Sequence, residues 1–76
     1  MANLTNPIDA KEFALDWLKE CRRQKTSPAT NYYLNDAYKI LQTRLDSAIF
    51  HDEGTEKIEN LKKCLKPIQL AIETVF

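Results

Sequence analysis

The chain has 76 residues, of which 43% are apolar and 29% are charged, so it is long enough for one hydrophobic core and one domain spanning residues 1–76. Lysine plus arginine and aspartate plus glutamate both number 11, which excludes an overall charge that would attract the molecule to nucleic acid or membrane. A single glycine disfavours sheet folds, because these need many tight turns. The composition therefore predicts a single helical domain.

The ends and the cysteines of the chain indicate its compartment. No run approaches the roughly 18 apolar residues of a membrane span, and the first residues, M-A-N-L-T-N-P, lack the basic and apolar regions of a secretory signal. Cys21 and Cys64 do not show the dense spacing of a disulfide-stapled secreted domain. We expect a cytoplasmic protein with reduced thiols, no membrane contact, and loose residues 1–5.

The first helix is expected over about residues 7–25. Asn6 is a suitable N-cap, and Pro7 suits the first helical position because the N–H that proline lacks would have no partner there. Apolar residues then recur at spacings of three and four and form one stripe: Ala10, Phe13, Ala14, Trp17, Leu18 and Cys21.

The second helix is expected over about residues 28–50, with Ser27 as its N-cap and Pro28 at its first position. Its apolar residues cover about 180° of the helix surface. They are Tyr33, Leu34, Ala37, Tyr38, Ile40, Leu41, Leu45, Ala48 and Ile49. Such a wide face predicts that this helix lies between the other two.

The third helix is expected over about residues 56–75, after a loop in which Gly54 takes a left-handed conformation and Thr55 caps the helix. It has the most regular apolar repeat of the chain: Ile58, Leu61, Leu65, Ile68, Ile72 and Val75. The repeat keeps its phase across Pro67, which favours a kinked but continuous helix. The alternative is a break at Pro67 and a fourth helix, since lysines cluster just before the proline, as they do at helix ends.

These elements predict an all-α, up-down-up three-helix bundle, because the two loops are short and the helices are similar in length. At the level of architecture alone, this loosely resembles bacteriocin immunity proteins, which are antiparallel helical bundles. The resemblance implies an immunity or inhibitor protein as one alternative function.

The sequence shows no pattern that indicates catalysis, a metal site or a cofactor. His51 is the only histidine, and with Asp52 and Glu53 it lacks the further ligands that transition-metal sites draw on. Cys21 and Cys64 are expected to be buried and inert, with no base beside them. With no glycine-rich phosphate loop either, we expect a protein that is not an enzyme and has no small-molecule substrate.

Basic residues are expected to gather at one pole of the bundle. The end of the first helix and the later half of the third point the same way in an up-down-up arrangement. The residues concerned are Arg22, Arg23, Lys25, Lys62, Lys63 and Lys66. Such a pole would suit phosphates or an acidic protein surface, although each helix also favours basic residues at its own end.

Several apolar residues lie off the expected core stripes and are candidate contacts for a partner. The predicted anchors are Leu15, Leu70 and Phe76, with Tyr32 as a further contact. A kink at Pro67 could instead bury Leu70 and Phe76. The leading prediction is a small non-enzymatic interaction or regulatory module that binds another protein or itself as a homodimer. The main alternative is a nucleic-acid-binding accessory protein that uses the basic pole.

Overall fold

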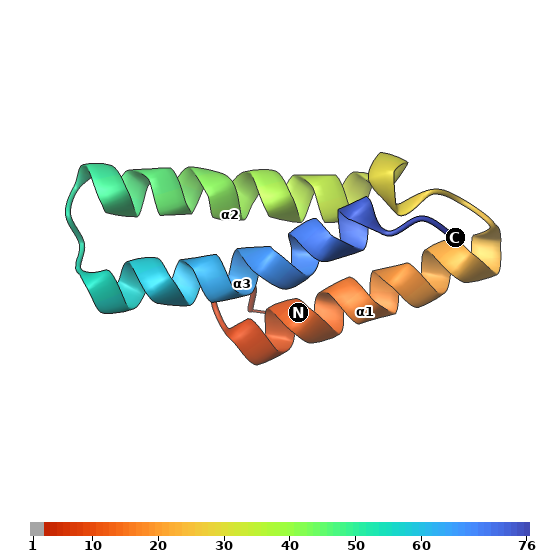
Figure 1. The fold of residues 1–76 in the computed structure, drawn as a ribbon, viewed down its shortest axis with the longest axis horizontal. Helices are drawn as coiled ribbons and strands as arrows, with labels where there is room; N and C mark the ends of the chain where they lie inside the picture. Colours follow the sequence, from red (N-terminus) through yellow and green to blue (C-terminus); the bar gives the residue numbers. More distant parts are fainter. Residues whose placement is uncertain (1–2) are drawn as a thin grey trace.

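The computed structural model describes residues 3–76 and shows three α-helices and one 3₁₀ turn (Figure 1). In chain order these are α1 (Pro7–Gln24), η1 (Pro28–Thr30), α2 (Tyr32–Phe50) and α3 (Thr55–Glu73). The chain runs one way in α1 and α3 and the opposite way in α2 (Figure 1). Over the described residues, which contain no strand, the predicted all-α up-down-up bundle is confirmed.

The start of α1 agrees with the sequence prediction. The Asn6 side chain accepts hydrogen bonds from the backbone N–H groups of Ile8, at 2.9 Å, and Asp9. At the other end, Lys25 takes a left-handed conformation with φ 57°, and its N–H donates back to the carbonyl of Arg22. The helix therefore ends at Gln24, one residue before the predicted boundary.

The second helix begins later than predicted, because Ser27 and Pro28 start a single 3₁₀ turn instead. Asn31 is the N-cap of α2, and its side-chain oxygen accepts a hydrogen bond from the N–H of Leu34 at 2.9 Å. Ser27 and Asn31 are both suitable capping residues and lie four residues apart, and Asn31 is the one next to the regular apolar repeat. The prediction of residue 28 as the start of this helix is therefore wrong by one turn.

The third helix passes through Pro67 without interruption, so the alternative of a break and a fourth helix is wrong. Figure 1 shows its axis bending in the C-terminal half. Gly54 has φ 107°, which requires glycine, and it occupies the N-cap position. Thr55 is already helical and makes no capping hydrogen bond, which corrects the prediction of Thr55 as the cap.

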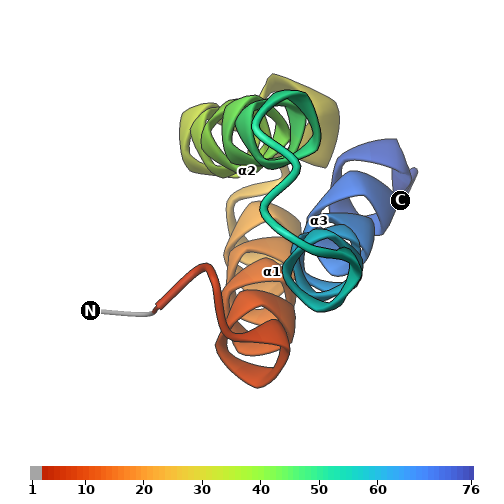
Figure 2. The ribbon, with the colours of Figure 1, turned by 90° about the vertical axis from the view of Figure 1, so that its left-hand side faces the viewer.

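The central helix is α3, not α2 as predicted. It packs along both other helices, whereas α1 and α2 touch each other little (Figure 2). The core-facing residues of α1 are small, which lets α1 approach α3 closely. The buried cluster consists of Ala10, Ala14, Leu34, Ala37, Leu41, Leu45, Ala48, Leu61, Cys64, Leu65, Ile68 and Ala71.

Because α1 does not cover it, the wide apolar face of α2 is only partly buried. Tyr33, Ile40 and Ile49, all predicted to face the core, are 54%, 44% and 53% exposed. In the same way Val75 is 91% exposed, since α3 ends at Glu73 and the last residues leave the repeat. These four residues are corrections to the predicted core.

Two contacts determine how α1 and α3 are aligned. At one end, the Asn60 side-chain amide donates to the carbonyl of Thr5 at 2.8 Å, and at the other the Arg22 guanidinium lies 4.8 Å from the centre of the Phe76 ring. The two helices run in the same direction, and Pro7, Ile8 and Lys11 of α1 line one pocket together with Lys63, Lys66, Pro67 and Leu70 of α3. The first turns of α1 therefore lie beside the middle and later part of α3. The α2–α3 hairpin therefore extends beyond the start of α1 (Figure 1).

The predicted loose segment, residues 1–5, is described in part. Leu4 packs against the core cluster, and the Thr5 carbonyl accepts the hydrogen bond from Asn60. Met1 and Ala2 lie outside the described residues.

Candidate protein-binding surfaces

An apolar groove runs between α1 and α3. Its floor contains Ile8, Pro67 and Leu70, and lysines stand along its edges. Ile8 is 69% exposed and Leu70 is 54% exposed, although both side chains are purely apolar. We call this feature the α1–α3 groove, and it is lined by Pro7, Ile8, Lys11, Lys63, Lys66, Pro67 and Leu70.

The groove follows from the spacing of residues on each helix and from the alignment of the two helices. Ile8, Lys11 and Leu15 follow one another at steps of three and four, so they share one flank of α1. On α3, Lys63, Lys66, Pro67 and Leu70 follow one another at steps of three, one and three, and they line the groove together with Ile8 and Lys11. Both helices therefore contribute apolar and basic side chains to the groove.

The lysines of the groove keep their positive charge unneutralised by the chain itself. Within residues 3–76, the ion pairs are Arg23 with Glu20, Lys57 with Glu53, and Lys62 with Glu59 at 3.6 Å. None of these pairs includes Lys11, Lys63 or Lys66. The groove therefore combines an apolar floor with a local positive potential.

The structure divides the six predicted basic residues among different places. Lys63 and Lys66 line the α1–α3 groove, whereas Arg22 and Lys25 line a separate pocket at the C-terminal end of the bundle. The six side chains therefore do not come together as one pole.

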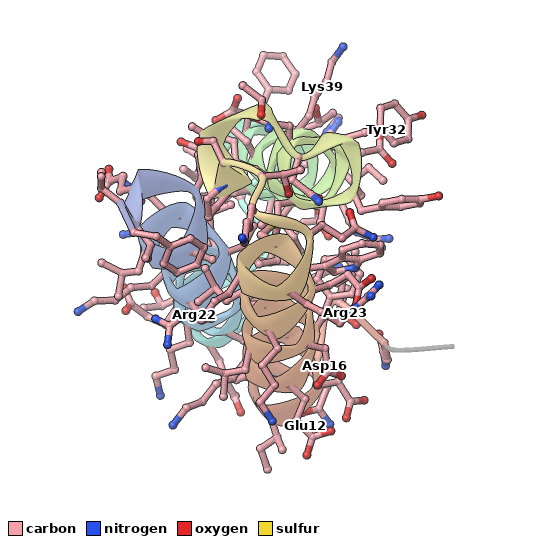
Figure 3. The ribbon with its side chains drawn as sticks, turned by 90° about the vertical axis from the view of Figure 1, so that its right-hand side faces the viewer. Glu12, Asp16, Arg22, Arg23, Tyr32 and Lys39 are labelled. Carbon is pink, nitrogen blue, oxygen red and sulfur yellow. The ribbon has the colours of Figure 1, made fainter. Side chains whose placement is uncertain are left out.

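Two of the six predicted basic residues form ion pairs with acidic side chains on their own helix. Lys62 pairs with Glu59, and Arg23 pairs with Glu20, which lowers the pKa of the Glu20 carboxyl through the hydrogen bond from Arg23. Figure 3 shows Arg22 and Arg23 on opposite sides of α1. Sequence reasoning did not select Lys11, although its position between Ile8 and Leu15 on the same flank was a signal for it.

The four predicted partner contacts are all exposed: 47% for Leu15, 72% for Tyr32, and 54% for both Leu70 and Phe76. Leu70 lines the α1–α3 groove, whereas Leu15 lies on the same flank of α1 as Ile8 but is not among the residues that line it. Phe76 packs under Arg22 in the C-terminal pocket. Tyr32 lies on α2, away from Arg22 and on the side of α1 that carries Arg23 (Figure 3). Of the four predicted contacts, only Leu70 therefore lines the groove.

Aromatic side chains join α1 to α2. Trp17 stacks on Tyr33, with ring centres 4.4 Å apart and planes 12° apart, and Phe13 meets Trp17 edge-on at 6.5 Å. Tyr32 continues the row by an edge-on contact with Tyr33 at 5.5 Å. Trp17 is partly buried and packs against the core cluster. This row stabilises the bundle, and only its outer end, Tyr32, is largely free for a partner.

The two thiols are buried and free. Burial raises the pKa of the Cys64 thiol, while Cys21 accepts a hydrogen bond from the Asn31 side chain at 3.5 Å. His51 follows the last turn of α2, and no three metal-binding side chains come together anywhere in the described part of the chain.

Comparisons with known proteins do not assign this chain to a family. Among the helices that the structure describes, none has the length and apolar character needed to cross a membrane. The chain matches no protein-family model, no curated protein and no solved structure.

Proposed function

We propose that the protein is a non-enzymatic protein–protein interaction module and that the α1–α3 groove is its contact surface. The observation that carries the proposal is the combination, in one groove, of exposed Ile8 and Leu70 with three lysines that form no ion pair within residues 3–76. An apolar centre with a polar rim is the usual anatomy of a protein interface.

The apolar part of the groove would supply most of the binding energy. Complete burial of one leucine or isoleucine side chain contributes about 1.5 to 3 kcal/mol. Ile8, Leu15 and Leu70 are about half or more exposed in the isolated chain, so a partner that covers all three removes a large part of this apolar surface from water.

The charge of the groove favours a different protein over a second copy of this chain. In a two-fold symmetric dimer through this groove, Lys11, Lys63 and Lys66 of one copy would face the same lysines of the other. Like charges at an interface cost binding energy, whereas an acidic partner would be attracted. A heterologous partner is therefore the better candidate.

A photo-crosslinking experiment tests the interaction. A benzophenone side chain introduced at Leu70 should form an adduct with one discrete protein in an extract of the native cells. The same group at Phe50, which is 85% exposed at the far end of α2, is the matched control. The proposal requires an adduct with the benzophenone at Leu70 and none with the benzophenone at Phe50. The adduct at Leu70 should also be lost in the double variant Lys63→Glu/Lys66→Glu. An adduct between two copies of the chain would assign the groove to a homodimer. Equal labelling at both positions, or no adduct, contradicts it.

Nucleic-acid binding is the second candidate, favoured by Lys11, Lys63 and Lys66 lying along one groove. If each lysine contacts one phosphate of a duplex, the logarithm of the affinity should fall with the logarithm of salt concentration with a slope of about −2.7. Titration of duplex and single-stranded DNA and RNA at low salt measures this. An absence of binding excludes this function. Nucleic-acid binding is the weaker of the two candidate functions, because the apolar residues of the groove add nothing to phosphate contacts.

A further inference from the structure

We propose that the occupant of the α1–α3 groove is an amphipathic α-helix of the partner that carries acidic residues beside its apolar stripe. The inference rests on the proposed function and adds the shape and charge of the partner segment. The helix would pack against α1 and α3 on the side away from α2 and complete a four-helix arrangement with this chain.

The spacing of apolar side chains along the groove suits a helix. Ile8 and Leu15 are seven residues apart on α1, which is two helical turns, or about 10.5 Å along the axis. Across the groove, Pro67 and Leu70 are three residues apart on α3. A helix laid along this line meets apolar side chains with its own residues at steps of three, four and seven.

The walls of the groove also favour a helix over other apolar ligands. All of its lining residues come from α1 and α3, which pack against each other and run in the same direction, so the groove lies between two neighbouring helices. A third helix packs on such a pair by placing a ridge of its side chains between those of the other two.

The lysines determine the charge of the occupant. Lys11 lines the groove from α1, whereas Lys63 and Lys66, about one turn apart, line it from α3. Long lysine stems can cover the flanks of an apolar helix while their ammonium groups reach carboxylates beside its stripe. Aspartate or glutamate on both flanks of the stripe would therefore pair with lysines from both helices.

Designed peptides of about 18 residues test both features, a length that spans the groove with a turn to spare at each end. The first peptide has leucines at helical spacing and flanking glutamates. The second has the same leucines and flanking lysines, and the third has the composition of the first in an order that removes the stripe. Binding is followed by the amide shifts of the ¹⁵N-labelled protein, whose spectrum also reports whether each variant is folded.

The acidic peptide should bind at least about tenfold more tightly than the other two, with the largest shifts in residues 8–15 and 63–70. Leu70→Asn should weaken its binding about tenfold or more, while Phe50→Asn, an exposed control on α2, should not. The double variant Lys63→Glu/Lys66→Glu should bind the lysine peptide more tightly than the acidic one. Lys39 projects from α2 (Figure 3), so Lys39→Glu should leave the preference for the acidic peptide unchanged.

Other outcomes overturn the inference. Equal binding of all three peptides, shifts outside the groove, or no binding at millimolar peptide would each do so. Binding of phosphatidylglycerol vesicles without binding of the acidic peptide would identify a membrane-facing surface. If the peptides fail while the crosslink at Leu70 forms and depends on the lysines, the interaction function stands and only the helical, acidic nature of the partner segment is wrong.

Discussion

Single side chains hold the ends of the helices, and Asn31 does so for α2. Its oxygen accepts the Leu34 N–H at 2.9 Å, whereas Ser27, the earlier capping residue, serves only the short turn η1. We expect Asn31→Ala to lower the free energy of unfolding by about 1 kcal/mol. Ser27→Ala is the control and should cost less. Urea denaturation measures both, and equal losses would show that Asn31 is not the effective cap.

The thiol of Cys64 gives a second prediction at the level of residues. It is fully buried in the core, and burial raises the pKa of its thiol above the ordinary 9.0. It should react with a thiol reagent at pH 8 only when the protein opens, so its rate should follow the unfolding equilibrium as urea is added. Fast labelling of Cys64 in the native protein would contradict its burial; mass spectrometry of the labelled peptides separates it from Cys21.

The same pKa shift predicts the direction of an alkaline effect. A thiol with a raised pKa in the folded state stays protonated after the unfolded chain has begun to ionise at about pH 9. The contribution of the buried, protonated thiol to the stability of the folded state is therefore complete below this pH and is lost as the pH rises further. Cys64→Ala should remove that part of the alkaline loss of stability.

Among the elements, α3 carries an internal cost at Pro67. Proline removes the hydrogen bond to the carbonyl of Lys63 and crowds the preceding turn, at a cost of up to about 3 kcal/mol in a helix interior. Pro67→Ala should therefore raise the unfolding midpoint. Pro7→Ala is a matched control, because Pro7 stands at the first position of α1, where no hydrogen bond is missing.

Calorimetric or urea midpoints of the two variants decide the matter. If Pro67→Ala is no more stable than Pro7→Ala, packing of the Pro67 ring against neighbouring side chains must already offset the lost hydrogen bond. Pro67 also lines the α1–α3 groove. The residue that destabilises the helix therefore also adds the apolar surface of its ring to the proposed contact site.

The whole molecule is unequally covered by its three helices. It measures 41 Å along its long axis and 19 Å across, and α1 covers only one part of that length (Figure 1). At the other end, the last turns of α2 and the first turns of α3 form a two-helix hairpin (Figure 1). With fewer apolar contacts, this end should open more easily.

Native-state hydrogen exchange tests this difference. Amides near Ser47–Phe50 and Ile58 should exchange through local opening, whereas those near Leu41 and Leu65 should require nearly global unfolding. Uniform protection along α2 and α3 would show that the hairpin end is as stable as the covered part.

The sequence by itself determined the helices and most of their ends. Asn6 with Pro7 located the start of α1, and the unbroken apolar phase across Pro67 indicated one continuous helix. These features depend on residues within about one turn of each other, which local hydrogen bonding and periodicity control. Where two signals competed, as Ser27 did with Asn31, local reasoning selected the wrong one.

Only the tertiary structure decided which helix is central and which side chains share a surface. Leu70 could be recognised from sequence as an apolar residue off the core stripes, but not as part of one groove with Ile8. That depends on how α1 is placed along α3, to which the Asn60–Thr5 hydrogen bond and the packing of Ala10 and Ala14 contribute. The same placement puts Arg22 and Lys63 in different pockets and Lys11 and Lys66 in one, because the position of one helix along another is a property of their contact and not of either sequence repeat.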